Sequence, residues 1–479
     1  MKKIFLIGMP VFLIGLLFFS FSMTVFTIVL MVLLLLWAVT FFREGAYDAT
    51  DIPILILLMG TLCFGRAFSL MGIHAGRIPI YVTELAAVVS LGLLLLKRKS
   101  PGKLWQAWRP ALPKELTVGL AAYFLMGILY LVIGVMGNGS AALRDITFCF
   151  YIVFLFIGLS LLENPVKVQN FLGFLLPGVI ILMVMSVIIF FVYVPGATIF
   201  RQLFKDIKMT NLGLYHGLIL IFGLSFFTSD RVAGKAGKWL LGLLLYLSFL
   251  FIIMAEVRAA WAGLLVALVL MGFLLKKEMK IFILIFLLMI PSFLIIDYFD
   301  LGVQKDKLAS LKEQVTTIAK RRVHTMPAAN IKWRLGIWRQ TIKEIREYPI
   351  FGWGYGTQID YVIWKQRLSW LKAIGANTGV LPPHNHLLAI TYKMGVLGLL
   401  LFLFINFMIF FRGLFYIKKC KSEFNRRFLI ASLAGLVYWH GMAFFFDVLE
   451  SPPTGIFLWI ILGAILGVVY LDRRSFQKE

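Results

Sequence analysis

Residues 382–398, PPHNHLLAITYKMGVLG, mark the point at which a long basic segment enters an apolar run. The run continues to about residue 411, which is long enough to cross the roughly 30 Å hydrocarbon layer of a bilayer as a helix. His384 therefore stands at the edge of a predicted span, where an ionisable side chain is a candidate functional group.

Similar apolar runs recur along the whole chain. Apolar residues make up 61% of its 479 residues, and the mean hydropathy is +0.92. These values predict an all-α fold, a polytopic bundle of about fourteen transmembrane helices. The first two runs are too long and too apolar for a cleavable signal peptide and are expected to remain in the mature protein. The predicted spans are 4–20, 23–42, 52–70, 79–96, 116–136, 142–161, 170–194, 210–228, 239–255, 259–275, 281–297, 386–411, 428–447 and 455–471.

Lys and Arg are concentrated in alternate connections between these spans. The connections 97–114, 229–238, 276–280 and 412–427 are basic, and all fall on one side if every predicted span crosses. Basic connections face the cytoplasm, so both termini are expected inside. The opposite side carries several short links and one long segment.

The expected organisation has three parts. They are an N-terminal transmembrane bundle (1–297), a periplasmic loop with surface helices (298–385) and a C-terminal three-span bundle with a cytoplasmic tail (386–479). The loop has more basic than acidic residues and two predicted helices, 308–322 and 331–347. The second helix spaces Trp333, Ile337, Trp338, Ile342 and Ile345 along one apolar face, which could lie on a bilayer surface with its Arg and Lys toward anionic headgroups.

Several classes of function lack their sequence signals. The formal net charge of +24 follows from the loops between spans, and no nucleic-acid-binding motif accompanies it. Cys63, Cys149 and Cys420 have no metal-ligand spacing, and no DxD pair lies on the outer face. There is also no P-loop or dinucleotide-binding fingerprint. We therefore expect no metal, no other cofactor and no soluble nucleotide donor, which favours a lipid-borne donor.

Three residues fall on the predicted outer surface and could act together. They are Arg258 in the link AEVRAAWAG, Arg334 in RLGIW, and His384. Two guanidinium groups suit a diphosphate, whose oxygens accept bidentate charge-assisted hydrogen bonds. A neutral histidine beside them could take a proton from an attacking hydroxyl. This combination predicts transfer of a group from a lipid diphosphate to an alcohol.

Each residue of the pattern also has a purely structural interpretation. Arg258 could anchor the end of a span, and Arg334 could decorate a surface helix. Asn385 could cap the helix that follows it. Gly395 and Gly398 could permit close packing between helices.

Other polar residues near the spans are weaker candidates. Asp447 and Glu450, in FFFDVLESPPTG, lie on the same predicted surface and could orient the imidazole or bind sugar hydroxyls. His216 and His440 are isolated membrane histidines, for which packing is the simpler explanation. Asp145 is expected to pair with a nearby arginine.

Together these residues form a recognisable pattern. The segments RLGIW (334–338, ending in Trp338) and PIFGWGYG (349–356), with the pattern HN-x9-G-x2-G (384–398), resemble the signature of the bacterial O-antigen ligase and O-antigen polymerase superfamily. The resemblance covers about residues 250–412, and Arg258 resembles the second arginine of that family.

The resemblance implies a class-C-like membrane glycosyltransferase in the bacterial inner membrane, with its active site on the periplasmic face. It implies a metal-independent reaction in which a glycan leaves undecaprenyl diphosphate. His384 would be the base, and Arg258 and Arg334 would clamp the diphosphate, with Trp338 and Asn385 in support. The predicted spans outnumber those usual for the ligases, with the surplus at the N-terminus, which leaves a polymerase possible.

The acceptor distinguishes the enzymes that fit this pattern. A ligase uses lipid A-core oligosaccharide, a polymerase uses a second undecaprenyl-linked repeat unit, and an oligosaccharyltransferase uses protein hydroxyls. A basic outer surface would attract the phosphates of lipid A-core, although the same charge could hold surface helices on anionic lipid. A transporter of lipid-linked glycan would need charged residues deep within its spans. A scaffold gives no reason for two arginines and a histidine on one face.

Overall fold

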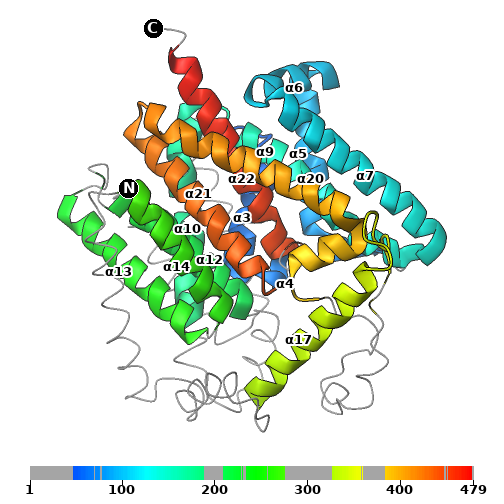
Figure 1. Cartoon of the computed structure of the whole chain (residues 1–479). Coiled ribbons are helices and arrows are strands. Elements are labelled where there is room, and N and C mark those ends of the chain that lie inside the picture. The colour runs from blue at the N-terminus through cyan, green and yellow to red at the C-terminus, as the bar shows by residue number, and fades with distance from the viewer. Residues whose placement is uncertain are drawn as a thin grey trace.

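The computed structural model describes a helical bundle (Figure 1). The described residues are 47–69, 71–75, 78–187, 209–227, 229, 234–255, 257–275, 326–357, 359, 383–446, 449 and 451–476. The elements in chain order are α3 (Ile52–Phe64), α4 (Arg66–Ser69), β1 (Gly72–Ala75), β2 (Ile78–Tyr81), α5 (Val82–Arg98), α6 (Pro101–Trp108), η1 (Arg109–Ala111), α7 (Lys114–Asn138), η2 (Gly139–Ile146), α8 (Thr147–Phe150), α9 (Val153–Leu161), α10 (Pro165–Val187), α12 (Met209–Phe227), α13 (Gly234–Met254), α14 (Arg258–Leu274), α17 (Met326–Ile345), α20 (His386–Tyr416), η5 (Ile417–Lys419), α21 (Glu423–Ala443) and α22 (Pro452–Phe476).

Each predicted span that falls on described residues coincides with a helix or with consecutive short helices. Within the described residues, five helices are long and apolar enough to cross a membrane: Lys114–Leu143, Pro165–Val187, Gly237–Met254, His386–Lys419 and Pro452–Arg474. The chain is therefore a multi-pass membrane protein. The predicted spans 4–20, 23–42 and 281–297 and the predicted helix 308–322 lie outside the described residues, so the total of about fourteen stays a prediction.

The all-α fold class is confirmed for the described residues, with one short hairpin in a connection that the sequence did not predict. β1 and β2 pair as an antiparallel hairpin in which Gly72 faces Tyr81 and Ala75 faces Ile78. A Cβ on Gly72 would lie 2.4 Å from the carbonyl oxygen of Ile80, so only glycine allows the strands to approach this closely. Hydropathy missed the hairpin because the link is too short to show alternation.

Alternate connections gather at opposite ends of the bundle. At one end, Arg98 Nη2 lies 2.8 Å from Glu163 Oε2. At the other end, Asn138 Nδ2 donates to the carbonyl oxygen of Tyr355 at 2.8 Å. Figure 1 shows α6 and the C-terminal end of α22 on one side and α17 on the other. This is the alternation that the predicted crossings require, and in the orientation predicted from Lys and Arg the α6 end is the cytoplasmic one.

The C-terminal helix α22 is the centre of the bundle. Its apolar window is 94% buried, against 33% to 44% for the other helices long enough to cross. An apolar helix that is buried all round lies among other helices, whereas the others keep one side for lipid. The neighbours of α22 include α9, α20 and α21, so α20 and α21, which carry the candidate site, contact the rigid core directly.

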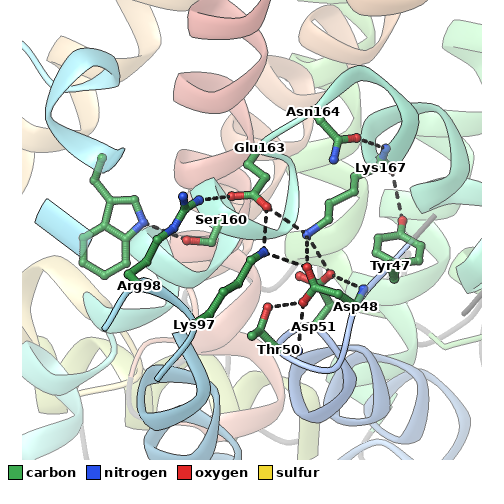
Figure 2. Close-up of polar contacts among 11 residues, drawn as sticks. Tyr47, Asp48, Thr50, Asp51, Lys97, Arg98, Ser160, Glu163, Asn164 and Lys167 are labelled. Atoms are coloured by element: carbon green, nitrogen blue, oxygen red, sulfur yellow. Dashed lines mark hydrogen bonds and ion pairs between the residues drawn. The ribbon is translucent and has the colours of Figure 1, made fainter. Parts of the chain in front are cut away.

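A network of ion pairs joins α3, α5 and α10 at the predicted cytoplasmic end (Figure 2). Lys167, only 3% exposed, lies 2.7 Å from Asp51 and 3.4 Å from Glu163. Lys97 lies 2.7 Å from Asp48 and 3.1 Å from Glu163. Glu163 thus contacts three cations, counting Arg98, and fixes the separation of these helix ends.

Replacing Glu163 by Gln is expected to lower the free energy of unfolding by roughly 1–3 kcal/mol, because the buried Lys167 and the partly exposed Lys97 and Arg98 lose a charged partner. Burial alone would raise the pKa of Glu163, but Lys167 and Lys97 outweigh it and hold the pKa below its usual 4.5. The stabilisation is therefore complete above the usual pKa and is lost as pH falls through the lowered value. Thermal unfolding in detergent should show a lower Tm for Glu163→Gln and a weaker loss of Tm on acidification. The exposed Glu347→Gln is the matched control, and equal Tm values would contradict the expectation.

Candidate active site

The helix α20, which begins directly after His384 and Asn385, is bent at Gly395. This glycine has a φ of 68° and a ψ of −176°, outside the helical region. The 31 residues of α20 would form a rod of about 46 Å, whereas the arm after the bend is about 30 Å long and can cross the bilayer alone. The bend therefore divides the predicted span 386–411 into a short arm and a spanning arm, which diverge in Figure 1.

The turn at residues 349–354 fills the break in α20. In a straight helix, Val396 and Leu397 would donate to the carbonyl oxygens of Tyr392 and Lys393. Here Val396 N donates to Pro349 O at 2.8 Å and Leu397 N to Ile350 O at 3.3 Å. The freed carbonyl oxygens of Tyr392 and Lys393 accept from the backbone N–H groups at 353 and 354, at 2.8 and 3.0 Å. All four interrupted backbone groups thus find partners in the turn.

Two glycines allow this backbone insertion. A Cβ on Gly395 would lie 2.0 Å from the carbonyl oxygen of Ile350. A Cβ on Gly352, which has a φ of 71°, would lie 2.5 Å from the backbone nitrogen of Gly395. The helix-packing interpretation is therefore wrong for Gly395, which meets a turn. Gly398 faces Met394 of its own helix, where a Cβ would lie 2.3 Å from the Met394 Cβ.

The residues after the turn are anchored in the bundle by a buried ion pair. Lys393 Nζ lies 2.7 Å from Asp145 Oδ2, with both side chains at most 12% exposed. The same carboxylate oxygen accepts from Gly356 N at 2.7 Å. Tyr355 is fully buried beside these groups. The described partner of Asp145 is thus Lys393 on α20, and the expected pairing with an arginine stays a prediction because the side chain of Arg144 lies outside what the structure describes.

The helix α17 lies across the predicted outer end and holds the segment before His384. Trp338 Nε1 donates to the carbonyl oxygen of Pro383 at 2.7 Å. Its ring packs edge-on against Phe444, just beyond the end of α21, with centroids 5.8 Å apart. Ile337 on the same face is fully buried. The face predicted to lie on a bilayer therefore packs against protein at these residues, although Ile342 is exposed.

Arg334 lies one turn before Trp338 on α17 and reaches the same end of α21. Its Nη1 donates to the carbonyl oxygen of Phe445 at 3.5 Å, and its guanidinium lies 5.1 Å from the ring centroid of Phe446. The side chain is only partly buried. Arg334 and the Pro383–His384 segment thus meet at the end of α21.

His384 has an uncommon backbone conformation, and Asn385 fixes the helix that follows. His384 is partly exposed with a φ of 50°, a left-handed value that is rare outside glycine and that clusters at functional sites. The Asn385 side-chain oxygen accepts from the backbone nitrogens of Leu387 and Leu388 at 3.0 and 3.1 Å. The capping interpretation of Asn385 is therefore confirmed, and the cap sets the direction in which the chain leaves His384.

Two neighbouring histidines, His386 on α20 and His440 on α21, lie near this surface. His386 is 2% exposed, and its ring centroid is 5.4 Å from that of His440. His440 Nε2 is 3.2 Å from Asn406 Oδ1. The sequence had suggested that His440 is isolated in the membrane, but it has two polar neighbours, His386 and Asn406. His216 is fully buried with its Nε2 2.8 Å from Ser186 Oγ, as expected of a packing residue.

The remaining predicted site residues are described only in part. The side chain of Arg258 and the residues Asp447 and Glu450 lie outside what the structure describes. The backbone of α14 nevertheless begins at Arg258 and packs against α21, where a Cβ on Gly263 would lie 2.9 Å from Tyr438 O. The two helices run in opposite directions. The start of α14 at Arg258 therefore lies near the C-terminal end of α21, the end that Arg334 also reaches.

This end of the bundle offers cationic and imidazole groups. Among the residues that the structure describes, no three His, Cys, Asp or Glu side chains gather to hold a metal ion. The described charge at the end of α21 is the guanidinium of Arg334, which suits an anionic oxygen ligand. An imidazole held close by can exchange a proton with a bound hydroxyl.

Residues 243–403 match the family model described as O-antigen ligase. The match runs from α13 through α17 to the spanning arm of α20 and agrees with the resemblance expected for about residues 250–412. Among curated proteins, none is similar enough to count as a relative. The chain therefore carries an O-antigen ligase family domain, which includes Arg258, Arg334, His384 and the bend at Gly395.

Proposed function

We propose that this protein is a glycosyltransferase that moves a glycan from undecaprenyl diphosphate to a hydroxyl of lipid A-core oligosaccharide on the periplasmic face of the inner membrane. The family domain supports glycan transfer of the ligase or polymerase type from a lipid-linked substrate. The observation that carries the proposal is that α17 contacts both partners at one end of the bundle: Arg334 donates to the carbonyl oxygen of Phe445, just beyond α21, and Trp338, one turn later, donates to that of Pro383, directly before His384.

In the proposed reaction, the acceptor oxygen bonds to the anomeric carbon as the bond from that carbon to the diphosphate breaks. His384 takes the proton of the acceptor hydroxyl, and the departing electron pair stays on the diphosphate. Arg334, with Arg258, neutralises the charge that develops on the leaving group. Attack from the face opposite the diphosphate predicts inversion at the anomeric carbon.

The packing around α17 supports this assignment of roles. Trp338 links the helix that carries Arg334 to the backbone of Pro383, directly before His384. Fixed donors are more effective than mobile ones, because no reorganisation is needed as charge develops. The turn at 349–354 then holds the end of α17 against α20.

Replacing Arg334 by Gln is expected to lower kcat by about 10²-fold, as removal of one preorganised donor does in other enzymes. Arg334→Lys should recover only part of the rate, because an ammonium cannot bind two oxygens in a fixed fork. Initial rates of glycan transfer by purified protein measure the effect. The control is Arg339→Gln, which removes an exposed arginine of the same helix. Equal rates for the two Gln variants would contradict the role of Arg334.

The acceptor can be identified by reconstitution. Purified protein in proteoliposomes is supplied with undecaprenyl-diphosphate-linked glycan and either lipid A-core or a second lipid-linked repeat unit. We expect glycosylated lipid A-core and free undecaprenyl diphosphate, detected by mass spectrometry. If only the glycan on undecaprenyl diphosphate is extended, the protein is a polymerase and not a ligase. The absence of transfer to any acceptor would overturn the proposal.

A further inference from the structure

We propose that residues 348–351, the turn that begins the insertion into α20, also anchor the protein in the membrane by placing Ile350 and Phe351 among lipid acyl chains. This inference concerns the outer rim of the bundle and does not depend on the proposed reaction. The argument rests on the exposure, the fixed backbone and the depth of the turn.

The apolar side chains of the turn are exposed. Ile350 is 61% exposed and Phe351 is 63% exposed. The preceding Tyr348 packs edge-on against Trp353 and is still 54% exposed. Three large apolar side chains within four residues are more than the scattered single residues found on a water-facing surface.

The backbone of the turn is held by hydrogen bonds to two helices, which fixes where these side chains leave the protein. The carbonyl oxygens of Pro349 and Ile350 accept from Val396 and Leu397 of α20. The carbonyl oxygen of Phe351 accepts from the hydroxyl of Tyr130 on α7. The backbone is thus tied to two helices while the side chains at 350 and 351 point away from the bundle.

These attachments also set the depth of the turn. Val396 and Leu397 begin the arm of α20 that is long enough to cross the bilayer. Tyr130 lies about 24 Å along α7 from Lys114, which is within the roughly 30 Å thickness of the hydrocarbon layer. The turn is therefore level with the boundary of the apolar layer.

The exposed side chains continue a lipid-facing surface. On α7, residues next to Tyr130 are exposed and apolar, and the same is true at the start of the spanning arm of α20. These residues are Leu129, Val132, Ile133, Val396, Leu397 and Leu400. Since lipid covers such faces of a membrane bundle, acyl chains are the occupant that the neighbouring helices already require.

Charge near the turn fits the same partner. Arg339, Lys343 and Arg346 are exposed on α17 and just after it. Basic side chains beside an apolar wedge are typical of segments that bind at the interface, where they meet anionic headgroups while the apolar groups enter the acyl region.

The inference can be tested with an environment-sensitive fluorophore. The full-length protein, with half-buried Cys420 replaced by Ser, carries a single added cysteine, Phe351→Cys or Ile350→Cys, labelled with a nitrobenzoxadiazole probe in proteoliposomes. Cys63 and Cys149 are buried and should not react. Leu129→Cys on the lipid-facing side of α7 and Lys103→Cys, at an exposed position of α6, are the matched lipid and water controls.

We expect blue-shifted emission at 350 and 351, with most of the intensity lost in lipids brominated near the headgroup end of their chains. Bromines near the chain terminus should quench these probes less, because the anchor enters only the upper acyl region. The probe at 103 should emit as in water. Water-like emission at both 350 and 351 would overturn the inference. Blue-shifted emission without quenching by brominated lipid would also overturn it, because the turn would then be covered by protein or by a second copy of the chain.

Discussion

A His384→Asn variant is expected to transfer glycan about 10²- to 10⁴-fold more slowly than the wild-type protein. The variant keeps a polar side chain of similar size, and asparagine tolerates the left-handed backbone conformation that His384 adopts at a φ of 50°. The cap made by Asn385 involves a different side chain and should persist. The loss should therefore fall on kcat.

Two measurements separate proton transfer from a structural role of His384. The Tm of His384→Asn should equal that of the wild type, and added imidazole should restore part of the rate to His384→Gly, in which a small base can enter the vacated space. Loss of Tm together with rate would indicate a structural role. Transfer by His384→Asn at nearly the wild-type rate would remove His384 from the reaction.

Replacing Gly395 by Ala should abolish most of the transfer and also destabilise the protein by roughly 2–6 kcal/mol, from backbone strain and overpacking. The new Cβ would lie 2.0 Å from Ile350 O and 2.3 Å from Ile350 C, both backbone atoms that cannot move alone. Relief of this clash would expel the turn from α20 and release the end of α17. Arg334 and Trp338 would then lose their fixed positions.

The matched control is Gly137→Ala near the end of α7, where an added Cβ meets nothing within 4 Å. That substitution should leave Tm and transfer unchanged, since alanine is the better helix former. Thermal unfolding in detergent and initial rates in proteoliposomes measure both effects. A Gly395→Ala protein with wild-type Tm and rate would show that the bend does not position the site.

Hydropathy predicted the helices because each span is a local apolar run, and the alternation of basic connections predicted which ends lie together. The insertion at Gly395 could not be predicted in this way, since it consists of backbone hydrogen bonds between residues 349–354 and 392–397. Backbone hydrogen bonds impose no side-chain pattern, so glycine is the only sequence signal of the insertion. A glycine alone has several structural explanations. The pairing of Lys393 with Asp145 joins residues 248 positions apart, beyond any periodic signal.

The candidate site could be predicted as far as local patterns reach. The cap by Asn385 follows from its position before an apolar run, and the structure confirms it. The contact of Trp338 with Pro383 could not be predicted, because it depends on how α17 packs back against the bundle. The roles of His384, Arg334 and Arg258 stay predictions, since they concern substrates.

The inserted turn also constrains how the chain enters the membrane. If α20 crossed the bilayer while residues 349–354 remained on the other side, four backbone groups at the bend would lack partners in or near hydrocarbon. Each unpaired group costs several kcal/mol there. Placement of residues 349–354 beside the bend and integration of α20 are therefore coupled steps, so a shortened chain that omits the turn should impair membrane integration of the span as well as transfer.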